Sequence, residues 1–196
     1  INNCLFTNPV DGMCSDSEYG AMPDWDVSNV TDMSSAFISK NSFNGDIISW
    51  DVSSVTNMAF MFYYAKAFNQ DLSSWDVSNV INMRDMFGSA YAFNQDIGTW
   101  DVSNVTTMEE MFFLASAFNQ DISAWDVSSV TNLSTFLRGT SISVANYDTL
   151  LTSWSALTLQ QGVTFSNSTL QYCTAGAARQ SIIDTYGWVI EDAGKA

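Results

Sequence analysis

Two sets of aspartates recur at a fixed interval, and they are the residues whose type and spacing best suit chemistry. Within each set the interval is 25 residues. Carboxylates are the hard oxygen ligands that Ca²⁺ prefers, so stacked carboxylates could form a calcium-stabilised surface module. The alternative is that each carboxylate accepts hydrogen bonds from nearby backbone N–H groups and shapes a turn. The candidate calcium ligands are Asp46, Asp71, Asp96 and Asp121 in one set and Asp26, Asp51, Asp76, Asp101 and Asp126 in the other.

The remaining composition argues against catalysis. The chain has no histidine, so it lacks the usual general base and the commonest transition-metal ligand. It has no glycine-rich phosphate loop, and each aspartate of interest occurs in several copies, whereas a catalytic site is usually unique in a chain. We therefore predict that the protein is not an enzyme and that it needs no cofactor other than, in the calcium hypothesis, Ca²⁺.

The charge limits the partners. With 6 basic and 21 acidic residues, the formal net charge is −15. Such a chain repels a phosphate backbone, which predicts no nucleic-acid partner. No apolar run is long enough to span a bilayer, which predicts no membrane insertion by this segment. The predicted partner is a protein or a glycan on another surface.

Cysteines and sequons bear on the compartment. Cys4 and Cys14 could form a disulfide, which would suit an oxidising compartment. Cys173 is then left over, either buried or paired with the N-terminal segment. Candidate N-glycosylation sites in Asn-x-Ser/Thr sequons are Asn29, Asn104, Asn132 and Asn167.

Apolar residues follow the same 25-residue interval, which is typical of a stacked array. The spacing of Val80, Met83 and Phe87 predicts a short helix in each unit, and "DISAWDV" predicts a short strand. The predicted fold class is therefore α/β, a leucine-rich-repeat-like β/α solenoid of about five 25-residue coils with N- and C-terminal caps. The clearest column is Trp25, Trp50, Trp75, Trp100 and Trp125.

The period divides the chain into three predicted parts, which are an N-terminal cap (1–24), a repeat region (25–140) and a C-terminal cap (141–196). Within the C-terminal cap, "NYDTLLTSWSAL" and "AGAARQSIIDTYGW" predict helices, and "WVIED" predicts a last strand. The second helix is expected to stop at Gly187.

The stretch "VTNMAFMFYYAKAFNQDLSSWDVSNV" resembles the repeat of the bacterial surface protein repeat family, which is related to the BspA-like leucine-rich repeats. The resemblance covers roughly residues 25–140 and rests on V-T-x-M-x-x-M-F, F-N-Q-D and W-D-V-S. It implies a leucine-rich-repeat-like solenoid, surface exposure, and a role in adhesion or binding.

We therefore predict a non-catalytic secreted or cell-surface protein that mediates adhesion or macromolecular recognition, located outside the cell or on its surface. The alternatives are a structural spacer and the calcium-stabilised module. If the ladder of strands is used for binding, its small exposed residues would form the binding face. These are Ser73, Ser74, Gly98, Thr99, Ser123 and Ala124.

Overall fold

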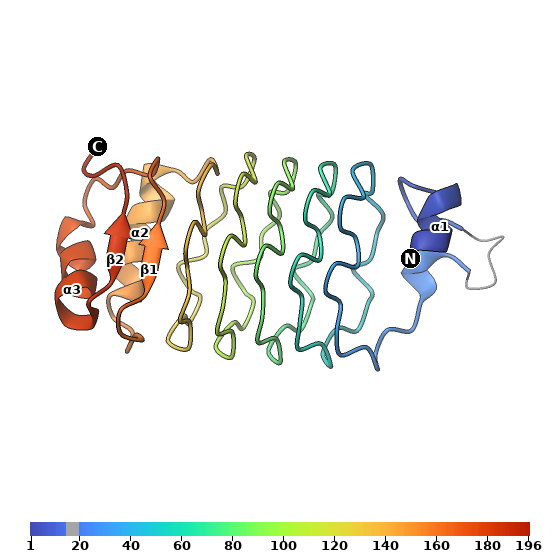
Figure 1. The fold of residues 1–196 in the computed structure, drawn as a ribbon, viewed down its shortest axis with the longest axis horizontal. Coiled ribbons are helices and arrows are strands. Elements are labelled where there is room, and N and C mark those ends of the chain that lie inside the picture. The colour runs from blue at the N-terminus through green and yellow to red at the C-terminus, as the bar shows by residue number, and fades with distance from the viewer. Residues whose placement is uncertain (15–19) are drawn as a thin grey trace.

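The computed structural model describes residues 1–14 and 20–196, and most of them lie in turns and loops. Helix α1 lies at the N-terminal end, and the other helices and both strands gather at the C-terminal end (Figure 1). A short 3₁₀ turn covers Met22–Asp24. The helices and strands of the described residues are α1 (Asn2–Thr7), α2 (Val144–Trp154), β1 (Thr164–Ser166), α3 (Gly176–Tyr186) and β2 (Val189–Glu191).

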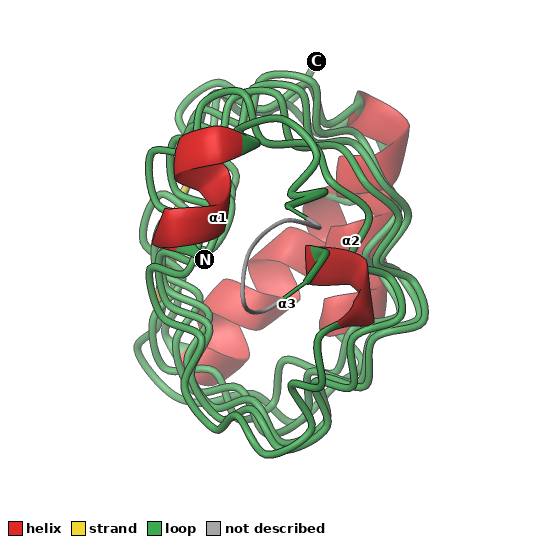
Figure 2. Ribbon diagram, turned by 90° about the vertical axis from the view of Figure 1, so that its right-hand side faces the viewer, coloured by secondary structure: helices red, strands yellow, loops and turns green. Residues whose placement is uncertain are grey.

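Between the two ends, successive 25-residue segments of loop lie side by side. Seen along the long axis of the molecule, the loops follow nearly the same outline (Figure 2). Isolated parallel bridges join residues that are 25 apart in sequence. These bridges are Asp32↔Asn57, Asn57↔Asn82, Asn82↔Thr107 and Thr107↔Asn132.

The predicted leucine-rich-repeat-like β/α solenoid of five coils, each with a strand and a helix, is wrong. The described residues hold three α-helices and two strands in one parallel sheet, and residues 25–143 hold no helix or strand. The backbone hydrogen bonds give the reason. Phe62 N donates to Met86 O at 2.8 Å, while the next amide, Tyr63 N, donates to Phe60 O at 3.1 Å. Because alternate amides bond to the neighbouring segment and to the third residue back, neither a helical nor a strand ladder forms.

Left-handed residues also interrupt the predicted helices. Most segments contain two of them, four residues apart, as at Phe60 (φ 58°) and Tyr64 (φ 59°). A non-glycine residue in this region costs roughly 1 kcal/mol, and it cannot continue a right-handed helix. The residues other than glycine with positive φ are Ser35, Ser39, Phe60, Tyr64, Asp85, Ser89, Glu110, Leu114 and Thr135.

Aromatic side chains run through the interior in register. The rings of Phe62 and Phe87 stack with centroids 5.5 Å apart, and those of Phe68 and Phe93 with centroids 6.2 Å apart. The buried Trp75 donates its indole N–H to a carbonyl 28 residues earlier, at 3.2 Å. Hydrogen bonding of the indole removes the cost of burying its polar group. The same bond recurs from Trp50 to Met22, from Trp100 to Leu72 and from Trp125 to Ile97.

The C-terminal elements close one end of the molecule. The helices predicted there are present as α2 and α3, and Gly187 ends α3 with a φ of 65°. Strand β1 pairs in parallel with β2. The residues at and after the end of β1 meet the last loop segment. Ser166 Oγ accepts from Thr135 N at 3.1 Å, and Asn167 Oδ1 accepts from Leu137 N at 2.8 Å.

Candidate functional site

The two aspartate sets lie on the surface, where every member accepts a hydrogen bond from the backbone N–H two residues later. At Asp76, for example, Oδ1 accepts from Ser78 N at 3.0 Å and from Ser78 Oγ at 2.6 Å. Bonds of this kind to Ser28 hold the pKa of Asp26 below its usual value. Within the described part of the chain, no group of three or more His, Cys, Asp or Glu side chains is placed to hold a metal ion. The geometry of these carboxylates is that of turn-forming residues.

The cysteines fall into one pair and one free thiol. Cys4 and Cys14 form a disulfide, and Cys173 is free and exposed. The disulfide ties α1 to the chain that follows it.

The four sequons differ in accessibility. Asn29 and Asn104 are exposed, and Asn132 is half-buried with Oδ1 accepting from Ser134 N. Asn167 is fully buried beneath the last loop segment, so a glycan cannot reach it in the folded protein.

The six small residues proposed from sequence as a binding face lie on exposed or half-buried turns. Ser74 Oγ is already used, because it donates to Ile48 O at 3.2 Å. A Cβ built on Gly98 would lie 2.5 Å from Asp121 O. Adjacent segments therefore approach closely at Gly98, and the six small residues offer a partner little surface.

A second surface has larger side chains, and we call it the variable face. It consists of the outward side chains of residues 59–66, 84–91, 109–116 and 134–141, four stretches held side by side by backbone hydrogen bonds. The inward side chains of the first three stretches repeat as methionine, phenylalanine and alanine, whereas the outward ones differ from stretch to stretch. The core therefore does not determine the outward residues.

Aromatic and cationic side chains meet on the variable face. Lys66 Nζ lies 5.8 Å from the ring centroids of both Tyr64 and Tyr91, and Tyr91 is 39% exposed. Arg84 Cζ lies 5.6 Å from the centroid of the Phe60 ring. Each contact holds a cation over an aromatic face. Three of the six basic residues of the chain lie on this face: Lys66, Arg84 and Arg138.

Asp85 lies next to Arg84 in one of these stretches but is buried, and sequence reasoning missed this burial. Its residue exposure is 3%, its Oδ2 lies 3.4 Å from Arg84 Nε, and its Oδ1 has no hydrogen-bond partner. Burial, followed by the charge of Glu110, raises the pKa of Asp85 to about 6. The period carried no signal for this burial, because the equivalent positions hold Ser35, Phe60, Glu110 and Thr135, and none of these is buried.

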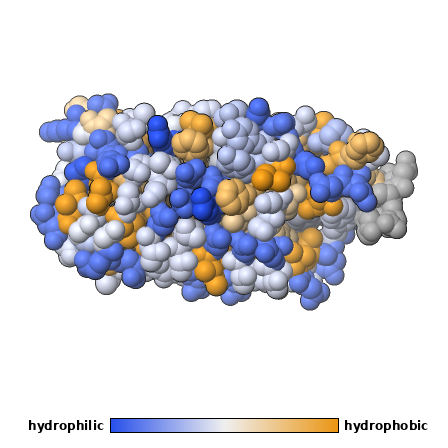
Figure 3. Space-filling view, viewed as in Figure 1, coloured by the Kyte–Doolittle hydropathy of each residue, from blue (hydrophilic) through white to orange (hydrophobic). Residues whose placement is uncertain are grey.

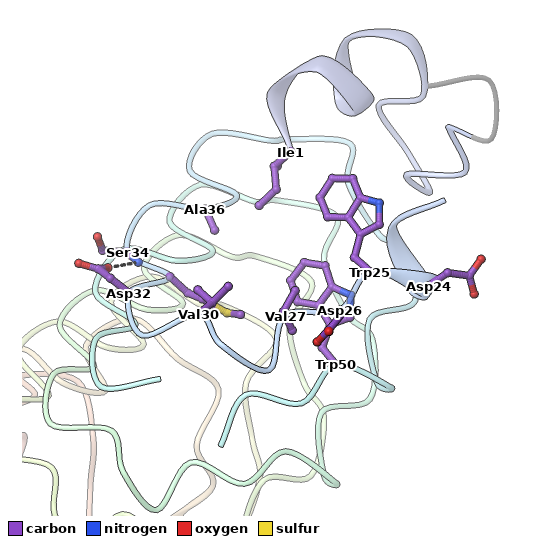
Figure 4. A pocket seen from close by; sticks show the side chains of 11 residues that line it. Ile1, Asp24, Trp25, Asp26, Val27, Val30, Asp32, Ser34, Ala36 and Trp50 are labelled. Atoms are coloured by element: carbon purple, nitrogen blue, oxygen red, sulfur yellow. Dashed lines mark hydrogen bonds between the residues drawn. The ribbon is translucent and has the colours of Figure 1, made fainter. Parts of the chain in front are cut away.

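The described residues also surround a cavity of 680 Å³ at the N-terminal end, which we call the end cavity. Figure 4 shows Ile1 pointing into it from the start of the chain and two tryptophans on its other side. Trp25 stacks on Trp50 with centroids 6.4 Å apart and an angle of 10°. The residues that line the end cavity are Ile1, Asp24, Trp25, Asp26, Val27, Val30, Asp32, Met33, Ser34, Ala36 and Trp50.

Hydrogen-bonded turns in a 25-residue register, flanked by small helical ends, define the class of structure. The family model described as "Mycoplasma protein of unknown function, DUF285" matches residues 10–112 and residues 75–171. The two matches cover more than half of the chain, so the chain belongs to the DUF285 family. The match does not test the resemblance to the surface protein repeat family, and it gives no support to the predicted secretion and adhesion. No curated protein and no solved structure matched the chain.

None of the described helices has the length and apolar character needed to cross a bilayer.

Proposed function

We propose that this protein is a non-catalytic recognition protein that binds another protein through the variable face. The observation that carries the proposal is the contact of Lys66 with the rings of Tyr64 and Tyr91 at positions that the core leaves free to vary. Tyrosine and arginine, together with tryptophan, are enriched where protein interfaces gain most of their binding energy. On the face of the molecule drawn in Figure 3, hydrophobic residues are interspersed with hydrophilic ones.

The remaining charges on the face favour a protein partner with charges of both signs. Arg84 lies 3.4 Å from the half-buried Glu109, so a cation and a carboxylate alternate over a short distance. Such alternation selects a partner by complementary charge. The Cys4–Cys14 disulfide supports a location outside the reducing cytosol, at the cell surface or beyond it.

A panel of purified surface proteins and glycans, immobilised and probed with the whole chain, tests this function. The variant Tyr64→Ala/Lys66→Ala/Tyr91→Ala should bind a protein of the panel at least about tenfold more weakly than the wild type. The matched control is Ser74→Ala/Thr99→Ala on the small-residue turn, which should bind as the wild type does. Unchanged melting of both variants separates lost contacts from lost folding.

Two results would contradict the proposal. Binding that the triple variant retains and the control loses would move the site to the small-residue turn. Silence across the whole panel would favour the structural spacer instead.

A further inference from the structure

Each loop segment after the first has a row of backbone carbonyl groups that accept hydrogen bonds from the preceding segment. In the second segment, Asn57 O accepts from Met33 N at 2.9 Å and Met61 O accepts from Phe37 N at 2.8 Å. In the third, Asn82 O accepts from Met58 N at 2.9 Å. The donor in each pair lies in the preceding segment, so these carbonyls point toward the N-terminal end.

No described residue donates to the corresponding carbonyls of the first segment. The backbone there has the same conformation, because Ser35 and Ser39 have φ values of 59°, like Phe60 and Tyr64 in the next segment. Four acceptors therefore face the N-terminal side in a row, without donors from the part of the chain that the structure describes. They are the carbonyl oxygens of Asp32, Ser34, Ala36 and Ile38.

This row borders the end cavity. Three of its four residues (Asp32, Ser34 and Ala36) line the cavity, and the apolar side chains of Val27 and Val30 also line it. The row lies on exposed and half-buried residues, so an occupant that covers it must supply donors, because a backbone acceptor buried without a partner costs free energy.

Charge restricts what can enter. Asp24 and Asp26 line the cavity together with Asp32, and no lysine or arginine is among the described residues of the lining. Hydrogen bonds from Ser28 to Asp26 and from Ser34 to Asp32 lower the pKa of both carboxyl groups, so both stay ionised at neutral pH.

Exposed apolar side chains are concentrated near the same end. Phe6 is 88% exposed, Val10 55%, Met13 51% and Ile38 39%. Exposed large apolar residues gathered in one part of a small protein are typical of an interaction site.

We propose that the end cavity binds a basic polypeptide segment of a partner protein, which adds its backbone to the first loop segment. Alternate N–H groups of that segment donate to the four carbonyls, and its basic side chains lie near the acidic residues of the lining. The mode is the addition of a strand to an open edge, with the main chain giving affinity and the side chains giving specificity. A second copy of this protein with its own N-terminal end turned toward the row would place carbonyl acceptors opposite carbonyl acceptors. The occupant must therefore present N–H donors.

The last loop segment of the protein has backbone N–H donors of the required kind, so its sequence supplies the peptide for the test. A synthetic peptide with the sequence of residues 131–140, TNLSTFLRGT, and blocked ends contains equivalents of the donors Thr135 N and Leu137 N. Its only charge is Arg138. Its glycine, Gly139, has a φ of 79° in the protein and allows the left-handed conformation that the row requires.

Titration of the intact protein with this peptide, followed by NMR of the backbone amides, tests the proposal. Saturable binding should shift the amide signals of Thr31, Asp32, Ser34 and Ala36. N-methylation of the peptide at Thr135 and Leu137 removes two donors and should weaken binding at least about tenfold. N-methylation at Ser134, which faces away from the acceptor row, should change it less than about threefold.

Protein variants test the charge. Asp26→Asn/Asp32→Asn should weaken peptide binding about fivefold at low salt and reduce its salt dependence. The control is Asp126→Asn, in the same aspartate set but in the last segment, which should change nothing. Equal binding of the peptide methylated at its donors, shifts confined to other amides, or no saturable binding would each overturn the proposal.

Discussion

The two ends of the molecule complete the hydrogen bonds of their outermost loop segments differently. At the C-terminal end, Ser166 and Asn167 present side-chain oxygens to Thr135 N and Leu137 N. At the N-terminal end, the matching carbonyls face a cavity lined by three aspartates. The segments between the ends pair their backbone N–H and C=O groups with one another, because residues 25 apart in sequence lie side by side. The comparison teaches that the register alone does not close the structure, because each end needs groups from outside it.

The first prediction removes the closure at the C-terminal end and has the largest expected effect. Asn167→Ala leaves the buried N–H of Leu137 without an acceptor and should lower the free energy of unfolding by about 2 to 3 kcal/mol. Urea denaturation measures this loss. The matched change at the other end, Ser34→Ala, should cost less than about 0.5 kcal/mol because Ser34 is exposed. Equal losses at the two ends would break the comparison.

The second prediction concerns the segments between the ends, where Asp85 is buried with one oxygen unpaired. Its raised pKa of about 6 means that the folded state disfavours the ionised form. The contribution of this carboxyl to the free energy of unfolding therefore falls as the pH rises from the pKa of the group in the unfolded chain through about 6. Asp85→Asn should stabilise the protein by about 2 kcal/mol near pH 7.5, and the gain should nearly vanish near pH 4.

Urea midpoints at the two pH values check this result. Asp101→Asn is the control with the opposite sign, because hydrogen bonds from Ser103 lower the pKa of Asp101. The contribution of Asp101 is present at neutral pH and is lost on acidification. A gain from Asp85→Asn that is the same at both pH values would show that the carboxyl does not titrate as described.

The third prediction compares the two ends of one left-handed column, which runs from Ser39 to Gly139. A Cβ on Gly139 would lie 2.7 Å from Leu114 Cδ2, so Gly139→Ala should cost about 1 to 2 kcal/mol. Ser39→Gly relieves a left-handed serine at the open end and should change stability by no more than about 0.5 kcal/mol. Thermal melting of both variants measures the difference, and a larger effect at Ser39 would reverse the comparison.

The sequence predicted contacts better than it predicted secondary structure. The 25-residue period indicated that equivalent residues meet, and Asn69 N does donate to Asn44 Oδ1 at 2.8 Å. The spacing of Val80, Met83 and Phe87 predicted a helix that is absent. An apolar spacing of three and four records only which side chains face inward. It does not show that Phe87 N donates to Met111 O in the next segment.

The candidate sites were harder to predict for a related reason. The aspartate sets stood out in the sequence because they repeat. In the structure each of these aspartates accepts a backbone hydrogen bond within a turn, and the turn is what repeats. The variable face and the end cavity are places where the repetition stops. Lys66 and Tyr91 occupy corresponding positions in adjacent segments, and only a backbone in register shows that the cation lies over the ring. The four open carbonyls have no side-chain signal at all, because they belong to the backbone.

Hydrogen exchange of one column of amides tests the difference between the ends most directly. Thr56 N, Ile81 N, Thr106 N and Thr131 N each donate to the carbonyl 25 residues earlier, at 2.8 to 2.9 Å, whereas Thr31 N has no described acceptor. Slow exchange at the four later positions and fast exchange at Thr31 is the expected pattern. Protection of Thr31 equal to that of Thr56 would show that the N-terminal end is closed and would contradict the account.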